Sequence, residues 1–142
     1  YVEAFQKAGA DYVTVHLEAC EDVKTTLDKI HACGMKAGLA VNPETDVKEL
    51  VPYLEDVEMI LIMSVHPGFG GQKFIEHSVE KVRELRALIE RTGSKALIEV
   101  GGGVNLETGA RLVEAGANAL VAGNAVFAAP DPEAMISQLH EL

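Results

Sequence analysis

Five short apolar runs alternate with longer amphipathic segments along the chain, and this alternation constrains the fold more than any other feature of the sequence. The predicted strands are Tyr12–His16, Ala37–Val41, Met59–Val65, Ala96–Val100 and Ala119–Ala122. Most of these runs are apolar throughout, which is typical of parallel strands that are covered on both faces. Alternating strands and helices form either an open doubly wound sheet or a closed (β/α)8 barrel. Five units are too few for a complete barrel and match somewhat more than half of one.

The segments between the predicted strands have the spacing of helices that pack on one face. One apolar stripe, with intervals of three and four residues, consists of Val79, Val82, Leu85, Leu88 and Ile89. Asn105 is placed to cap the helix that begins near Leu106. No linker or low-complexity segment interrupts the pattern, so we expect residues 1–142 to form a single α/β domain.

The chain is acidic, with a formal net charge of −10 at pH 7, which argues against a nucleic-acid-binding protein with its clustered Lys and Arg. No apolar run approaches the roughly 20 residues of a membrane-spanning helix, and no signal-peptide pattern opens the chain. The two cysteines, Cys20 and Cys33, fit neither a zinc pattern nor a disulfide framework. We therefore expect a cytoplasmic protein with reduced thiols. Because the sequence begins without Met and inside a helical pattern, we expect it to be a fragment of a longer chain.

Glycine-rich turns follow the third, fourth and fifth predicted strands, at the end of the sheet where parallel α/β folds bind their ligands. The residues are Gly68, Gly70 and Gly71, then Gly102 and Gly103, then Gly123 and Asn124. Glycine permits positive φ and close approach of the backbone, and amides ahead of a helix bind a phosphate dianion without any lysine. One such turn is usually only a tight connection. Three on one rim predict a phosphate site, and no P-loop or G-x-G-x-x-G motif accounts for them.

His16 ends the first predicted strand at the same rim, and Glu18 follows it closely. A neutral imidazole there can bind a metal ion, yet a lone histidine is more often a surface or core residue, and one ligand does not make a metal site. Glu18 is the alternative carboxylate of interest, and it shares a face with His16 only if the strand continues that far. Both interpretations stay open on the residues alone. Met63 lies close enough to a strand end to line a pocket.

Several motifs of the chain, in order and over essentially its whole length, resemble the ribulose-phosphate 3-epimerase family. They are VTVHLEA, GMKAGLAVNPET, ILIMSVHPGFGGQKF, IEV-GGV-N and GANALVAGNAVF. The GFGGQ loop together with HLEA is a specific combination, although the related epimerase that acts on allulose 6-phosphate shares much of it. The resemblance implies a (β/α)8 TIM barrel of which this chain holds a part, the fourth to eighth strands with their helices.

The resemblance also implies an activity, the interconversion of D-ribulose 5-phosphate and D-xylulose 5-phosphate in the pentose phosphate pathway. In the family a divalent metal, often zinc with iron, manganese or cobalt as other options, is held by two His and two Asp. The two Asp act as acid and base on opposite faces of C3, while the metal stabilises the enediolate as charge develops. The implied partner is a small sugar phosphate, and we expect the full-length protein to be a homo-oligomer.

Carried over residue by residue, the resemblance assigns most of the site to the rim. His16 matches a metal-ligand histidine that also lies at the substrate. The other implied substrate-binding residues are Met63, Gly68, Phe69, Gly70, Gly71, Gly102, Gly103, Gly123 and Asn124.

Gly101 departs from the family pattern. The family has Asp-Gly-Gly after this strand, where the chain has Gly101, Gly102 and Gly103. Gly101 therefore occupies the position of an acid that is both metal ligand and proton donor. The remaining His and Asp ligands belong to a strand that this chain lacks. We expect no retained catalytic residue, and no significant epimerase activity from this chain alone.

Two other functions fit the same pattern. A non-catalytic sugar-phosphate-binding module would keep the glycine cradle and need no metal. Another barrel enzyme, such as a hexulose-phosphate synthase, would need an Asp or Lys reaching from Ala96–Val100 into the pocket. Glu99 is the only charged residue of that strand, and we expect it to face elsewhere. In a partial barrel, Tyr12–His16 and Ala119–Ala122 would be bare sheet edges, which favours self-association.

Overall fold

The computed structural model contains one sheet of five parallel strands whose order in space follows the chain, β1-β2-β3-β4-β5. The structure describes residues 2–66, 73–122 and 129–142. The strands are β1 (Tyr12–His16), β2 (Lys36–Val41), β3 (Met59–Met63), β4 (Leu97–Gly101) and β5 (Ala119–Val121). This confirms the expected parallel α/β fold, whereas a partial barrel remains a proposal.

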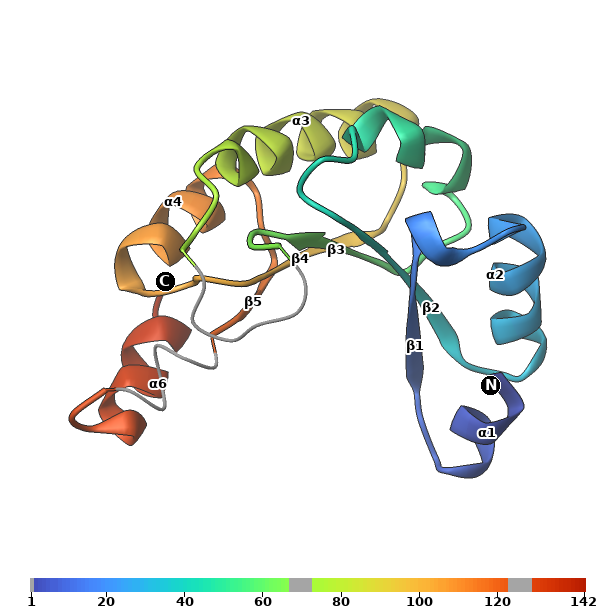
Figure 1. The fold of residues 1–142 in the computed structure, drawn as a ribbon, viewed down its shortest axis with the longest axis horizontal. Coiled ribbons are helices and arrows are strands. Elements are labelled where there is room, and N and C mark those ends of the chain that lie inside the picture. The colour runs from blue at the N-terminus through green and yellow to red at the C-terminus, as the bar shows by residue number, and fades with distance from the viewer. Residues whose placement is uncertain (1, 67–72, 123–128) are drawn as a thin grey trace.

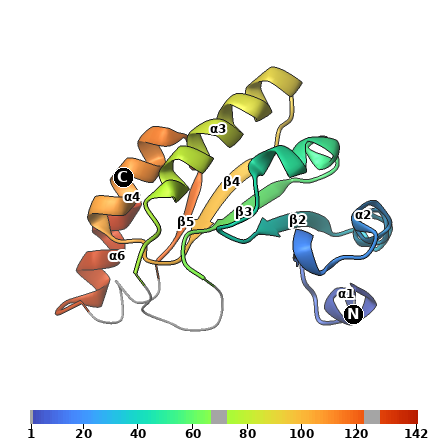
Figure 2. The ribbon, with the colours of Figure 1, turned by 45° about the horizontal axis from the view of Figure 1, so that its top comes forward.

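Helices connect the strands and lie on the outer side of the sheet. They are α1 (Val2–Lys7), α2 (Val23–Ala32), α3 (His77–Thr92), α4 (Leu106–Ala115) and α6 (Pro132–His140), with the 3-10 helices η1 (Leu17–Ala19) and η2 (Val47–Tyr53). Figure 1 shows the sheet bent into an arch, with α2, α3 and α4 along its outside. The turned view in Figure 2 places α3 and α4 over β3, β4 and β5. The arch therefore has a convex, helix-covered face and a concave inner face.

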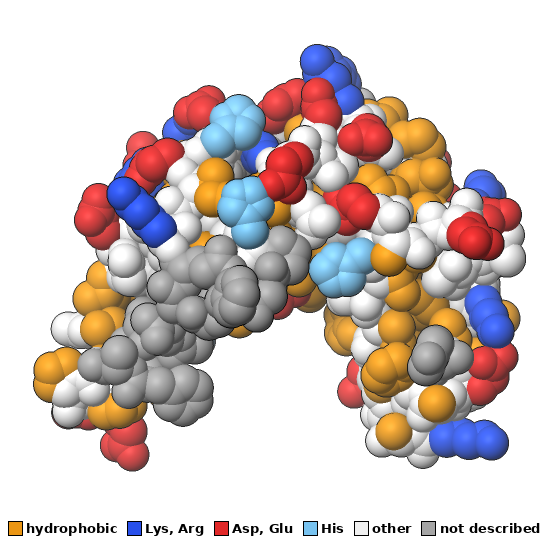
Figure 3. Space-filling view, viewed as in Figure 1, with side chains coloured by type: hydrophobic (Ala, Val, Ile, Leu, Met, Phe, Trp, Pro, Cys, Tyr) orange, Lys and Arg blue, Asp and Glu red, His pale blue; other side chains and the backbone are white. Residues whose placement is uncertain are grey.

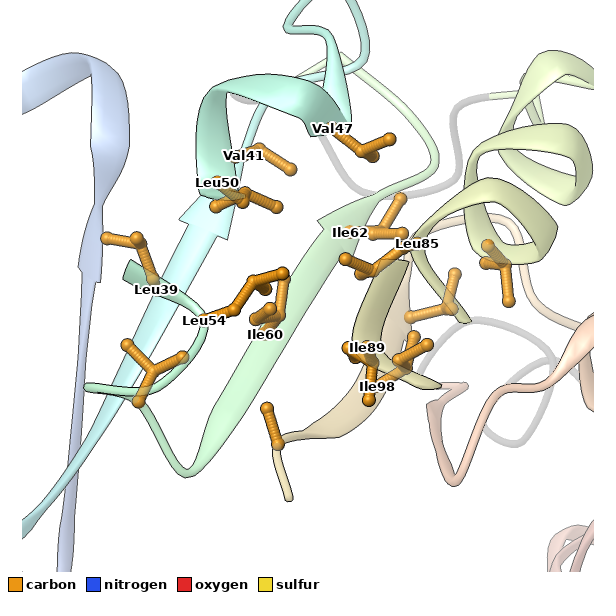
Figure 4. Packing of buried hydrophobic residues seen from close by; sticks show 14 of the residues in the cluster. Leu39, Val41, Val47, Leu50, Leu54, Ile60, Ile62, Leu85, Ile89 and Ile98 are labelled. Atoms are coloured by element: carbon orange, nitrogen blue, oxygen red, sulfur yellow. The ribbon is translucent and has the colours of Figure 1, made fainter. Parts of the chain in front are cut away.

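The hydrophobic core lies between the convex face and the helices. Ile60, Ile62 and Ile98 are fully buried, and Figure 4 shows them pointing toward Leu85 and Ile89 of α3. The helical stripe predicted from the spacing of apolar residues thus packs on the sheet as expected. Because strand side chains alternate, the residues between these isoleucines must face the concave side.

The concave face carries a different set of side chains. In the register of β1 and β2, Thr14 lies opposite Gly38, and a Cβ on that glycine would lie 2.5 Å from the Thr14 hydroxyl oxygen. The Lys36 ammonium lies 5.3 Å from the centre of the Tyr12 ring, a cation–π contact between the same strands. No described helix covers this face, and Figure 3 shows the hollow beneath the arch. The expectation that both faces are covered is therefore met only on the convex side.

The strand boundaries agree with the sequence pattern to within two residues. Predicted strand Met59–Val65 ends at Met63, and Ser64 just beyond it donates to the Gly101 carbonyl through both its backbone N–H and its hydroxyl, each at 2.8 Å. β1 and β5 are the two edges of the sheet, as expected. Within the described ranges, no helix is both long and apolar enough to cross a membrane.

Candidate functional site

The carboxyl ends of the strands lie along one rim of the arch, and the turn from Gly101 to Gly103 is the predicted phosphate turn that the structure describes. The other predicted glycine residues and Phe69 lie outside the described residues, namely Gly68, Gly70, Gly71, Gly123 and Asn124. The turn connects β4, a central strand of the curved sheet, to the first residues of α4.

Gly102 and Gly103 have conformations that only glycine adopts easily. Their φ angles are +108° and +67°. A Cβ on Gly102 would lie 2.5 Å from a methyl group of Val65, and one on Gly103 would lie 2.9 Å from the Cα of Phe74. Both positions therefore require glycine for backbone and steric reasons, whatever the ligand.

The carbonyl groups of this turn are held by two buried hydroxyl groups. Ser64, which is fully buried, donates to the carbonyls of Gly101 and Gly102. Thr108 donates to the Gly103 carbonyl at 3.1 Å and forms a reciprocal capping box with Asn105 at the start of α4. This confirms the predicted role of Asn105 as the cap.

The amides of the same turn are left without partners. Among the described residues, no group accepts a hydrogen bond from the backbone N–H of Gly102, Gly103 or Val104. These donors precede α4, whose N-terminal partial positive charge adds to theirs. Fixed carbonyls and free amides are the arrangement that binds an anion through the backbone.

Gly101 differs from the two glycines that follow it. It has extended β4 backbone rather than positive φ, and it pairs with Met63 of β3 and Val121 of β5. A Cβ at this position would meet Val121 at 3.5 Å and Leu61 at 3.6 Å, which are ordinary contacts. The fold therefore does not require glycine at residue 101, and a side chain there would stand on the concave face beside the turn.

His16 ends β1 at the rim as predicted, with an exposed side chain. The strand stops there, and Glu18 lies in η1, where its carboxylate accepts hydrogen bonds from the Asn42 amide at 2.9 Å and from the Thr45 hydroxyl. Burial alone raises the pKa of Glu18, but these two hydrogen bonds outweigh it and hold the pKa below its ordinary value. Glu18 thus links η1 to the turn after β2 at the rim.

The described residues do not fit a metal centre. No group of three or more His, Cys, Asp or Glu side chains gathers in this part of the chain in a way that could hold an ion. The carboxylate of Glu18 is already bound by two donors, and Gly101 offers no ligand atom. The expectation of a divalent metal on His16 therefore finds no support in the geometry.

Lys81 is a buried cation at the rim that the sequence pattern did not single out. It is only 4% exposed, and its ammonium donates to the carbonyls of Asn42 and Pro43, at 3.0 and 3.1 Å. Burial lowers the pKa of Lys81, while Glu18 and other nearby carboxylates oppose that effect. The turn after β2 is thus held by Lys81 from α3 and by Glu18 from η1. The position of Lys81 within a charged helical segment gave no signal of this.

Glu99 faces the concave side, and the expectation that it faces elsewhere is wrong. Its neighbours Ile98 and Val100 are fully buried on the convex side, so alternation turns Glu99 inward. It is half-buried, and burial raises the pKa of its carboxyl above the ordinary value.

Met63 lies on the same face and pairs with Gly101 one layer nearer the rim, where it was expected to line a pocket.

The model of the ribulose-phosphate 3 epimerase family matches residues 1–127. The chain is 46% identical over 140 residues to ribulose-phosphate 3-epimerase of Bacillus subtilis, which takes in 98% of the chain and 64% of the relative. It is 47% identical over 132 residues to the chloroplastic ribulose-5-phosphate-3-epimerase of Arabidopsis thaliana, covering 92% of the chain and 47% of that protein. The chain thus spans about two thirds or less of the relatives' length.

Solved structures show that the same fold occurs elsewhere. A crystal structure of 3-hexulose-6-phosphate synthase has a TM-score of 0.72 at 21% identity, over 99% of this chain and 65% of that one. The enzyme of that name from Salmonella typhimurium has a TM-score of 0.69 at 24% identity, over 99% and 64%. These similarities establish the fold alone.

The sequence matches decide the family. They take in nearly the whole chain and 64% of the Bacillus relative, and they do not bear out which portion of that relative the chain is. The motifs that suggested the resemblance, including the turn at Gly102 and Gly103, lie within the matched residues 1–127. The chain belongs to the ribulose-phosphate 3-epimerase family.

Proposed function

We propose that this chain carries the phosphate-binding turn of a sugar-phosphate epimerase, and that the reaction of the full-length protein interconverts D-ribulose 5-phosphate and D-xylulose 5-phosphate. The observation that supports this most strongly is the turn after β4. There the amides of Gly102 and Gly103 have no acceptor among the described residues, while the carbonyls are held by Ser64 and Thr108. Such a turn binds a dianion in a chain whose net charge is −10, since the attraction is local.

The proposal includes the architecture that the reaction needs. The five strands are one wall of a (β/α)8 barrel, and residues 1–142 act as a single domain of it, in a cytoplasmic protein that assembles as a homo-oligomer. The predicted turns at Gly68, Phe69, Gly70 and Gly71 and at Gly123 and Asn124 complete the cradle around the same phosphate.

This chain by itself does not catalyse the epimerisation. Inversion at C3 needs one group to remove the proton and another to return a proton from the opposite face. Among the described strand residues, Glu99 is the only carboxylate, and Gly101 has no side chain at the position where the family has an acid. The described residues contain no group of three or more His, Cys, Asp or Glu that could hold the metal that would stabilise the enediolate, so no step is assigned to one.

A non-catalytic sugar-phosphate-binding module is the second candidate, and the Gly102 and Gly103 amides, which have no acceptor among the described residues, favour it. An epimerase that acts on allulose 6-phosphate remains a closely related alternative for the full-length protein. Allulose 6-phosphate and ribulose 5-phosphate differ in the sugar rather than in the phosphate, so the turn at Gly102 and Gly103 serves either substrate.

The test combines calorimetry with a coupled assay for xylulose 5-phosphate, both with and without added zinc. We expect the chain to bind ribulose 5-phosphate without metal, to bind ribulose much more weakly, and to show no turnover. Robust turnover would refute the lost-acid interpretation. Equal binding of ribulose and ribulose 5-phosphate would refute the phosphate turn. Allulose 6-phosphate, titrated in the same way, distinguishes the two sugars.

A further inference from the structure

Glu99 stands apart from the other acidic residues because it lies on the inner face of the sheet. The register of the strands places it in one row with Leu61 of β3 and Ala119 of β5, neither of which carries a polar side-chain group. Among the described residues, no donor or cation pairs with its carboxylate. A half-buried carboxylate with no donor is costly to keep, and it marks a place where a ligand can supply the missing hydrogen bond.

Glu99 lies on the same face of β4 as the residue that ends the strand at the rim. Gly101 is two residues further along the same face, so it lies about 6.6 Å away along the strand, within reach of a glutamate side chain. Gly101 places no side chain of its own between Glu99 and the turn, and a Cβ there would contact Val121 at 3.5 Å and Leu61 at 3.6 Å. Glu99 therefore lies two residues below the turn whose Gly102 and Gly103 amides have no acceptor among the described residues.

We propose that Glu99 accepts a hydrogen bond from a hydroxyl group of the bound sugar, while the amides of Gly102 and Gly103 hold its phosphate. This inference rests on the proposed function and adds the residue that recognises the sugar. A carboxylate is an acceptor and sugar hydroxyls are donors, and Gly101 has no side chain to stand between the two. Glu99 contributes to affinity for the sugar and not for the phosphate.

The test is isothermal titration calorimetry of the full 142-residue chain with two probes, ribulose 5-phosphate and inorganic phosphate. Glu99→Gln keeps the shape of the side chain and removes the charge. Glu90→Gln is the matched control, because it removes the same charge from the exposed outer side of α3. We expect Glu99→Gln to weaken ribulose 5-phosphate binding by about 10-fold, the usual effect of losing a charged hydrogen bond, and to leave inorganic phosphate binding equal to that of the control.

The outcomes separate this inference from the function on which it rests. If the unmodified chain binds neither probe, the proposed phosphate turn fails and the role of Glu99 fails with it. If the unmodified chain binds both probes and Glu99→Gln changes neither affinity, only the role of Glu99 is overturned. An equal loss for both probes would also overturn it, because that result indicates a general change of the turn. Circular dichroism melts of both variants verify that the fold is retained.

Discussion

The two faces of the sheet show how this chain separates stability from binding. The convex face presents Ile60, Ile62 and Ile98 to α3, and all three are fully buried. The concave face presents Leu61, Glu99 and other residues that are only partly covered. Burial of apolar area stabilises the first face, whereas the second leaves a carboxylate without a partner. Residues of a single strand, one position apart, are therefore expected to respond very differently to substitution.

The largest difference is expected between two neighbours on β4. Ile98→Ala removes a fully buried side chain and leaves a cavity against α3, which we expect to lower the free energy of unfolding by about 2–5 kcal/mol. Leu97→Ala truncates a concave-face side chain that is 42% exposed, and the expected loss is below about 1 kcal/mol. Urea unfolding of the two variants measures both values. Equal losses would show that the concave face is as tightly packed as the convex one.

The next comparison is between two glycines of the same turn. Gly103→Ala forces a Cβ against the Phe74 backbone at a φ of +67°, and we expect it to cost roughly 2–4 kcal/mol. Gly101→Ala adds a Cβ at ordinary distances in extended backbone, so we expect no loss and a gain of up to about 1 kcal/mol. Thermal melts compare the two. A large loss from Gly101→Ala would mean that the fold itself demands glycine there.

The smallest effects are expected from two carboxylates whose pKa values shift in opposite directions. Burial raises the pKa of Glu99, so its ionisation costs stability as the pH rises through the folded-state pKa. Glu99→Gln removes that cost and is expected to stabilise the chain at pH 7 by at most about 1 kcal/mol. The gain should vanish as the pH falls well below 4.5, the ordinary value, because the wild-type carboxyl is then protonated in both states.

The pKa of Glu18 shifts in the opposite direction to that of Glu99. Its pKa is lowered by hydrogen bonds from Thr45 and Asn42, so the stability that it contributes is present above pH 4.5 and is lost as the pH falls through the folded-state pKa. Because the side chain is exposed, Glu18→Gln is expected to destabilise the chain at pH 7 by only about 0.5 kcal/mol. Urea unfolding at pH 4 and pH 7 measures the free energy of unfolding of Glu18→Gln and Glu99→Gln. If both substitutions changed the free energy of unfolding with the same pH trend, the pKa shift of Glu99 could not be due to burial and that of Glu18 to hydrogen bonding.

Much of the fold could be predicted because its signal is local. β1 spans Tyr12–His16 as predicted, and the apolar runs for the other strands are displaced by at most two residues at an end. Asn105 and Thr108 form the cap within four consecutive residues, and Gly116 ends α4 with a positive φ. These outcomes depend on steric and hydrogen-bonding preferences within a few residues of the chain.

The candidate site was predicted less completely, because its groups meet across strands. Nothing near Lys81 in the sequence indicates that its ammonium binds the carbonyls of Asn42 and Pro43. The direction of Glu99 was missed because a mostly apolar strand gives no alternation from which to read a face. The engagement of Glu18 by Thr45 likewise depends on a turn that follows another strand.

The amino-acid sequence by itself determined the order of strands and helices, the family, and the glycine turn ahead of α4, because apolar spacing, motif identity and backbone sterics are properties of short segments. Only the tertiary structure decided which glycines of that turn are indispensable, which amides are free, and which face Glu99 occupies. Those answers depend on Val65, Phe74 and Ile98 being brought into position by parallel pairing and helix packing. Contacts of that kind arise between segments that are distant in the chain, so no local pattern encodes them.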